Sequence, residues 1–140
     1  MNYKNNNIIK RNNILKVAID SPAAAGAGTQ AKYISKEYNL FYLDTGKIYR
    51  FIGKLRLDNK KNFTDNFIKK KIKRITFKDL NKKYLLSDEV ATSASIIAKK
   101  KGIRKLVKEF QKNCAYNPPN KFSGSVLDGR DITSVIMKDA

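Results

Sequence analysis

The chain has 140 residues, of which 30 are Lys or Arg and 12 are Asp or Glu, so its formal net charge at pH 7 is +18. It contains no His and a single Cys, Cys114, which together exclude a Ser-His-Asp triad, a Cys-His nucleophile pair, a His-ligated zinc site and an intramolecular disulfide. Its apolar runs are far shorter than the roughly 20 residues of a membrane span and its polar start is unlike a secretory signal, so we expect a soluble, cytoplasmic protein with no membrane partner.

The first third of the chain has the pattern of an α/β protein. Residues 1–13 are rich in Asn and Lys and predict a disordered leader. The apolar run 15–19 predicts a strand, and apolar residues at helical spacing follow Thr29. A second strand is predicted over 40–43, with a helix beginning at residues 44–46. Strand, small-residue loop, helix and strand in this order predict an α/β fold with a parallel sheet and flanking helices.

The remaining two thirds give less regular patterns. Residues 58–71 are mainly basic and predict no element. The sequence then predicts a short β pair of residues 72–77 and 83–86, followed by a helix that begins at 87 and is ended by Gly102. A second helix is predicted over 103–113 and a third sheet strand over 125–127.

The small-residue stretch between the first strand and the first helix is a candidate phosphate loop. Such a loop lets backbone N–H groups surround a phosphate at a helix N-terminus. Gly26, Gly28 and Thr29 fit the phosphate-loop pattern, whereas Ser21 replaces its first Gly and Ala27 replaces its Lys. A strand-to-helix turn that binds nothing is the alternative interpretation. The candidate phosphate-binding residues are Ser21, Pro22, Ala23, Ala24, Ala25, Gly26, Ala27, Gly28 and Thr29.

Three further stretches carry candidate ligand-binding side chains. Arg50 lies one helical turn beyond the cap at 45–46, where a guanidinium can pair with a phosphate, although it is equally a surface arginine. Residues 87–104 are a capped helix with a small-residue packing face, followed by Arg104. Asp128-Gly129-Arg130-Asp131 follows the third strand, where open α/β sheets bind ligands, or else forms a local ion pair in a loop.

Together and in this order, these motifs resemble the cytidylate kinase (CMP kinase) family. The resemblance begins near residue 15 and is carried by the stretches 17–22, 42–50, 90–104 and 128–140. It implies a P-loop nucleoside-monophosphate-kinase fold, with a kinase core over 14–57 and 101–140 and a substrate-binding insert over 58–100. The family continues beyond the stretch that ends here at Ala140 with a further strand, an arginine-bearing lid and helices. We therefore expect a fold that is incomplete at its C-terminus, and a fragment without the lid that activity needs.

The resemblance also implies a reaction and a set of roles. CMP kinases transfer the γ-phosphoryl group of ATP to CMP or dCMP, giving CDP or dCDP, with Mg²⁺ as the metal. The loop 21–29 would hold the ATP phosphates, with the Thr29 hydroxyl near Mg²⁺, and Ala27 stands at the position of the lysine that neutralises phosphate charge. The implied catalytic residues are Arg50, Arg130 and Asp131, and the implied substrate-binding residues are Thr45, Gly46, Arg50, Ser95, Arg104, Arg130 and Asp131.

The net charge of +18 has two interpretations. It indicates an anionic partner, or it reflects a genome rich in A and T, because Lys, Asn and Ile share A/T-rich codons. We expect CMP, dCMP and ATP as partners in pyrimidine nucleotide metabolism, no nucleic acid, and a monomer. The alternative is a catalytically impaired relative of the kinase that binds nucleotides or nucleic acid, and another nucleoside-monophosphate kinase is a third option.

Overall fold

The computed structural model describes residues 13–20 and 27–140, except for the side chains of Ala27 and Phe77. The predicted leader, apart from Asn13, and the candidate phosphate-loop residues 21–26 lie outside the described residues. The described chain divides into two compact units. Residues 46–110 form one, which we call the helical unit, and residues 13–45 with 111–140 form the other, which we call the sheet unit.

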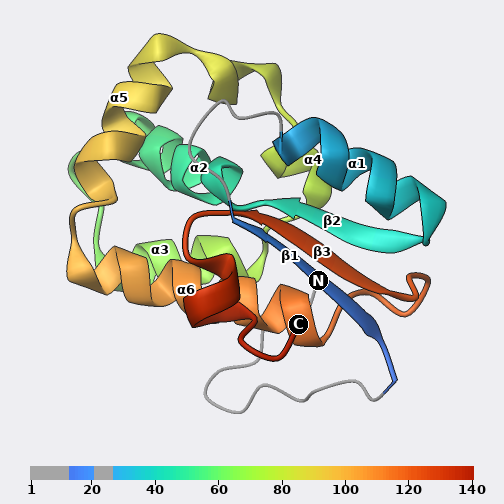
Figure 1. Ribbon diagram of the computed structural model, residues 1–140. Coiled ribbons are helices and arrows are strands. Elements are labelled where there is room, and N and C mark those ends of the chain that lie inside the picture. Colours follow the sequence, from blue (N-terminus) through green and yellow to red (C-terminus); the bar gives the residue numbers. More distant parts are fainter. Residues whose placement is uncertain (1–12, 21–26) are drawn as a thin grey trace. The chain divides into compact units, whose positions relative to one another are not determined.

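The sheet unit contains a parallel three-stranded sheet (Figure 1). Its strands are β1 (Leu15–Asp20), β2 (Leu40–Asp44) and β3 (Gly124–Gly129), in the order β1-β3-β2. The last strand in sequence is therefore the central one, and its residues 124–128 are all buried. The predicted α/β fold with a parallel sheet is confirmed.

Helix α1 (Ala27–Glu37) connects β1 to β2 and covers part of this sheet. Its buried Ala31 packs with Leu40 of β2 and Val126 of β3, and Ile34 lies against the same cluster. A single π-helical turn, η2 (Ile132–Ile136), follows β3 and is anchored by buried Ile132 and Ile136. The crossover from β1 through α1 to β2 is the arrangement that the pattern of the first 44 residues predicts.

The helical unit contains most of the helices. They are α2 (Thr45–Asp58), α3 (Asp65–Lys73), α4 (Phe77–Leu80), the 3₁₀ turn η1 (Lys83–Leu86), α5 (Asp88–Ile97) and α6 (Lys101–Tyr116). Helix α2 begins one residue before the unit and α6 continues past it at Phe110. Each helix contributes apolar side chains to the core, among them Ile48, Ile52, Ile68, Ile72, Leu80, Leu85, Val90, Ile97, Val107 and Phe110. No helix in the described part of the chain is long and apolar enough to cross a membrane.

Two predictions for this region were wrong. The expected β pair is absent: Ile72 lies in α3, and residues 83–86 form the 3₁₀ turn. The reason is a helix start at Thr64, whose hydroxyl accepts a hydrogen bond from the N–H of Phe67 at 3.2 Å, so that Ile68 and Ile72 fall on one buried helical face. Gly102 also does not end a helix, because it lies in the first turn of α6.

Helices α2 and α5 approach each other closely at Gly53. A Cβ atom on Gly53 would lie 2.8 Å from the backbone nitrogen of Ala94, a distance that real Cβ atoms do not adopt. The buried Ser93 hydroxyl donates to the carbonyl of Gly53 at 2.8 Å. The small residues of α5 therefore serve helix packing at Ser93 and Ala94.

The structural units do not test the predicted domains. The units meet at residues 45/46 and 110/111, whereas the predicted insert spans 58–100 and the predicted kinase core 14–57 with 101–140. The units are defined by compactness, while the predicted domains are defined by function. The predicted boundaries therefore stay predictions.

The contact at Gly53 predicts a stability difference. Gly53→Ala should lower the free energy of unfolding by about 1–3 kcal/mol, because the added methyl group forces α2 and α5 apart. Chemical denaturation measures it. Gly102→Ala is the matched control. Its Cβ would lie 3.4 Å from the carboxylate of Asp65, an ordinary contact distance, so the better helix propensity of Ala should leave the stability unchanged or raise it by up to about 1 kcal/mol. Equal effects of the two substitutions would contradict the close packing.

Candidate functional site

The loop after β3 has an unusual backbone conformation. Gly129 has a φ of 151°, and a Cβ there would lie 2.1 Å from the hydroxyl oxygen of Thr45, so only glycine fits. Asp131 has a φ of 57°, in the left-handed region that Asp tolerates better than most residues. Arg130 and Asp131, both predicted site residues, are exposed in this loop. Their orientation therefore depends on how the loop is anchored.

Strand β2 and the first residue of α2 anchor the start of the loop. The Thr45 hydroxyl donates to the backbone carbonyl of Asp128 at 2.9 Å, and this bond is buried. The Tyr42 hydroxyl donates to Oδ2 of Asp128 at 2.9 Å. Burial, reinforced by this bond and by the negative charge of Asp128, raises the pKa of Tyr42, which therefore stays a donor at neutral pH. In this structure the predicted substrate residue Thr45 orients the loop.

Strand β1 anchors the end of the loop through Asp20. One carboxylate oxygen accepts from the backbone N–H of Ile132 at 2.6 Å and from that of Thr133 at 3.1 Å, and the other accepts from the Thr133 hydroxyl. The Thr133 hydroxyl makes the largest contribution to lowering the pKa of Asp20, against a smaller opposing effect of burial. An acid with a lowered pKa is ionised above its ordinary value near 4, so this anchor is intact at neutral pH.

The start of α1 lies beside the same acidic group. A Cβ on Gly28 would lie 3.6 Å from the Tyr42 hydroxyl and 3.7 Å from Oδ2 of Asp128. Thr29, the predicted metal residue, is exposed in the first turn. Within the described ranges no three acidic or Cys side chains converge on a metal position. Thr29 and Asp128 carry oxygen atoms, the ligands that Mg²⁺ prefers, but they fall short of a complete protein site for the ion.

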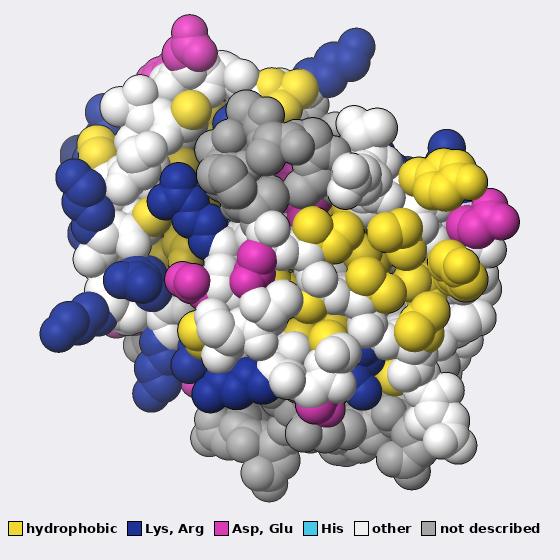
Figure 2. Space-filling view, viewed as in Figure 1, with side chains coloured by type: hydrophobic (Ala, Val, Ile, Leu, Met, Phe, Trp, Pro, Cys, Tyr) yellow, Lys and Arg dark blue, Asp and Glu magenta, His cyan; other side chains and the backbone are white. Residues whose placement is uncertain are grey.

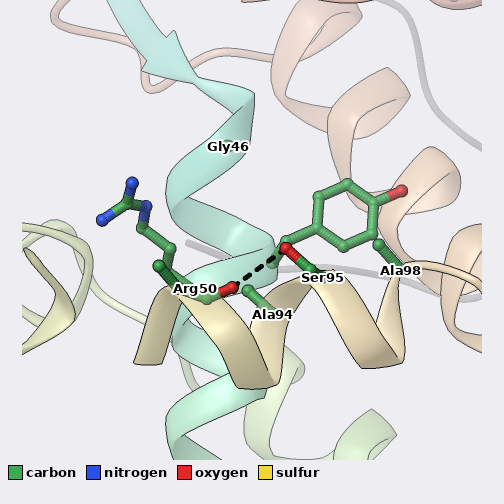
Figure 3. A pocket seen from close by; sticks show the side chains of 7 residues that line it. Gly46, Arg50, Ala94, Ser95 and Ala98 are labelled. Atoms are coloured by element: carbon green, nitrogen blue, oxygen red, sulfur yellow. Dashed lines mark hydrogen bonds between the residues drawn. The ribbon is translucent and has the colours of Figure 1, made fainter. Parts of the chain in front are cut away.

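The helical unit has its own pocket, between α2 and α5 (Figure 3). Its volume is about 240 Å³, below the roughly 300–1,000 Å³ of pockets that enclose a whole ligand, so it suits only part of a larger ligand. It is lined by Gly46, Tyr49, Arg50, Ala91, Ala94, Ser95 and Ala98. Three predicted substrate residues, Gly46, Arg50 and Ser95, are thus brought together.

The two polar side chains of this pocket are held by backbone carbonyls. The Arg50 guanidinium donates to the carbonyl of Leu85 at 3.1 Å and points away from Ser95 (Figure 3). The Ser95 hydroxyl donates to the carbonyl of Ala91 at 3.1 Å. A guanidinium has five N–H donors, so this bond leaves most of the hydrogen-bonding capacity of Arg50 to a ligand.

Arg104 is electrostatically linked to the pocket through Tyr49. Burial raises the pKa of Tyr49, and the positive charge of Arg104 opposes that rise. Arg104 itself is exposed near the start of α6. It therefore adds positive charge to a pocket that already contains Arg50.

The helical unit carries most of the positive charge. Residues 46–110 include 20 Lys or Arg and 6 Asp or Glu, so they contribute +14 of the net +18. Figure 2 shows Lys and Arg side chains gathered on the side where α3, α5 and α6 lie in Figure 1. Such an excess raises the local concentration of anionic ligands. The excess of positive charge is distributed over exposed helix surfaces and is not confined to the pocket.

The remaining candidate for nucleophilic chemistry is unsuitable. Cys114 is 1% exposed, and burial raises the pKa of its thiol far above neutrality. Since the thiolate is the reactive form, Cys114 is a core residue.

The predicted site residues are divided between the two units. Gly46, Arg50, Ser95 and Arg104 belong to the helical unit, and Gly28, Thr29, Thr45, Arg130 and Asp131 to the sheet unit. Of the candidate phosphate loop, residues 21–26 lie outside the described residues and Ala27 is described only as the first residue of α1. Sequence reasoning missed the anchoring residues Asp20, Tyr42, Asp128 and Thr133. For Asp20 and Asp128, the position at a strand end was a signal, because parallel strands end at one edge of the sheet.

The fold and the candidate site define the class of protein. A parallel sheet with its central strand last in sequence, a small-residue connection into α1 and exposed charged residues at the carboxyl ends of the strands make this an α/β protein of the P-loop nucleoside-monophosphate-kinase type.

Comparison with known proteins specifies the family. The family model described as cytidylate kinase matches residues 17–140. A cytidylate kinase of Bartonella tribocorum is 42% identical over 130 residues, covering 89% of this chain and 56% of its own length. One from Rhodopseudomonas palustris is 41% identical over 125 residues, covering 89% and 57%, and one from Paramagnetospirillum magneticum is 39% identical over 125 residues, covering 89% and 59%. The chain therefore belongs to the cytidylate kinase family, and it spans somewhat more than half the length of these curated relatives.

The Tyr42 hydrogen bond predicts a second stability effect. Tyr42→Phe should lower the free energy of unfolding by about 1–3 kcal/mol, because it removes a donor from a carboxylate that is largely shielded from water. Urea denaturation measures this. Tyr38→Phe, at a side chain that is 59% exposed, is the control and should change stability by less than about 0.5 kcal/mol. If both variants lose the same small amount, Tyr42 does not anchor Asp128.

Proposed function

We propose that this chain forms the CMP-binding part of a cytidylate kinase, an enzyme that transfers the γ-phosphoryl group of ATP to CMP or dCMP. The observation that carries the proposal is the anchored loop after β3, which exposes Arg130 and Asp131 at the carboxyl end of the central strand in a chain that matches the family from residue 17 to 140. The matched relatives are cytidylate kinases, which supports this reaction. The exposed positions of Arg130 and Asp131 support a role in binding the substrate.

The chain's own residues suit phosphoryl transfer by positioning and charge neutralisation. This reaction needs no protein nucleophile, which agrees with a chain that has no His and a buried Cys. Arg50 and Arg130 are proposed to bind the phosphate of CMP, because a guanidinium pairs bidentately with phosphate oxygens. Gly46 and Thr45, at the start of α2, are proposed to lie beside the bound nucleotide.

The cytosine base is proposed to be recognised by its hydrogen-bonding edge. The carboxylate of Asp131 can accept from the exocyclic amino group of cytosine, while Ser95 and Arg104 can donate to ring acceptors. Uracil presents a carbonyl in place of that amino group and would leave Asp131 facing an acceptor. The proposed substrates are therefore CMP and dCMP, not UMP.

The ATP side is proposed from the sequence and from the start of α1. Residues 21–29 would hold the phosphates, and Thr29 with Asp128 would hold Mg²⁺ bound to the nucleotide. When bound, Mg²⁺ neutralises phosphate charge during transfer. Ala27, at the position of the family's lysine, favours the competing proposal of a catalytically impaired relative. The protein is further proposed to be a cytoplasmic monomer without a nucleic acid partner.

Nucleotide binding tests the proposal directly. Titration calorimetry of this chain should give a dissociation constant for UMP at least roughly tenfold higher than for CMP, with dCMP close to CMP, because one mismatched base-edge contact costs about 1–3 kcal/mol. Equal affinities for CMP and UMP would refute recognition of cytosine.

On the full-length protein, ADP release that depends on ATP, Mg²⁺ and CMP would decide between the kinase and the impaired relative. The impaired relative would bind CMP without releasing ADP.

The role of Arg50 can be tested by substitution. Arg50→Ala should weaken CMP binding by about 2–4 kcal/mol, because it removes a charged bidentate partner, and should leave ATP binding nearly unchanged. Lys54→Ala removes the same charge from the same helix α2 and is the control, with an expected change below about 0.5 kcal/mol. An equal loss of ATP and CMP affinity in Arg50→Ala would assign this arginine to the other nucleotide.

A further inference from the structure

The π-helical turn η2, which follows the loop after β3, is not capped by the side chain of its own N-cap residue. Asp131 is the N-cap residue of η2, and Asp is among the residues that cap helices best. Its side chain makes no capping hydrogen bond, and it is exposed. In the part of the chain that the structure describes, the Asp131 carboxylate is thus left available to a ligand.

Asp20 supplies the missing cap from another element. Its carboxylate accepts from the backbone N–H groups of Ile132 and Thr133, at 2.6 and 3.1 Å, and from the Thr133 hydroxyl. Asp20 lies at the end of β1 and is 112 residues from Ile132 in sequence. A carboxylate from β1 therefore satisfies the first two N–H groups of the turn, and one of them, that of Thr133, is in the position that an N-cap side chain such as that of Asp131 ordinarily binds.

The other end of the loop is fixed independently. The Thr45 hydroxyl holds the carbonyl of Asp128, and the Tyr42 hydroxyl holds its carboxylate. The segment 129–131 is thus anchored at both ends, with positive φ angles at Gly129 and Asp131 that an unanchored loop would rarely keep.

We propose that Asp20 is a positioning residue for nucleotide recognition: by capping η2 in place of Asp131, its carboxylate keeps the Asp131 carboxylate free for the amino group of a cytosine base. This inference rests on the proposed function. Asp20 touches neither the base nor the transferred phosphoryl group in this role and acts through the loop. Without Asp20, the backbone of Asp131 relaxes from its left-handed φ of 57° toward the extended conformation of an N-cap, and its side chain then caps the turn and leaves the base.

The test compares Asp20→Ala with Asp20→Asn. Alanine removes the acceptor, whereas asparagine keeps an oxygen that accepts from the same N–H groups. The measured quantity is the ratio of the dissociation constants for UMP and CMP, which a loss of stability alone does not change because both nucleotides bind the same folded state. We expect Asp20→Ala to lower this ratio roughly tenfold and Asp20→Asn to keep it within about twofold of the wild type. An unchanged ratio in folded Asp20→Ala would overturn the inference.

A double-substitution cycle tests whether Asp20 acts through Asp131. In an Asp131→Ala background, Asp20→Ala should cause no further loss of discrimination, because the acceptor that it positions is already gone. The same loss in both backgrounds would show that Asp20 acts on the nucleotide by another route and would overturn the inference. If Asp20→Ala does not fold, Thr133→Ala takes its place in the cycle, because this variant removes only the hydroxyl donor to Asp20. A lower ratio of dissociation constants that depends on Asp131 would support the inference. An unchanged ratio would overturn the inference.

Amide hydrogen exchange separates this inference from the proposed function. The amides of Ile132 and Thr133 should exchange faster in Asp20→Ala and at the wild-type rate in Asp20→Asn. If the wild type binds neither nucleotide, the proposed function fails. The exchange rates of these two amides still test the capping role of Asp20 in that case. Unchanged exchange in Asp20→Ala would overturn it whatever the nucleotides do.

Discussion

The placement of β3 between β1 and β2 is the constraint on which the sheet unit depends. At the start of β3, a Cβ on Gly124 would lie 1.9 Å from the carbonyl oxygen of Leu15, so the two strands meet where only glycine fits. At its end, the buried carbonyl of Asp128 is held by the Thr45 hydroxyl. Because parallel strands end at one edge, the residues that anchor the loop and the residues that it exposes converge there without any local sequence signal that joins them.

The helical unit forms a small, mainly apolar pocket between packed helices, and Arg50 and Ser95 contribute polar groups to it. Gly53 and the small residues of α5 let two helices approach closely, and the pocket opens beside that contact. Its arginine, Arg50, is held by the carbonyl of Leu85. That bond holds the guanidinium in place, so a ligand must use the remaining N–H donors or displace the carbonyl. Tyr49 adds an aromatic surface that the sequence analysis did not predict, and the predicted residue Arg104 adds a positive charge.

The sequence predicted the sheet well because its strands are short apolar runs separated by recognisable turns and caps. The first helix after Thr29, the helix from Thr45 and the Ser87 cap were all local patterns, and the Ser87 hydroxyl does accept from the N–H of Val90. The basic region 58–86 was misjudged because Lys-rich turns hid the helical spacing of Ile68 and Ile72. The site was predicted through its charged residues, whereas its anchors were not: a hydrogen bond between Asp20 and Thr133 joins residues 113 positions apart, and no periodicity indicates such a pair.

The central claim is that the loop after β3 recognises the base of a cytidine nucleotide. A nuclear magnetic resonance titration of the isotope-labelled chain measures this most directly. With CMP, the backbone amides of Arg130 and Asp131 should shift and saturate, and with UMP at the same concentrations they should shift far less. Saturable binding of CMP that leaves both amides unmoved would contradict the claim, because the nucleotide would then bind without the residues that β3 presents.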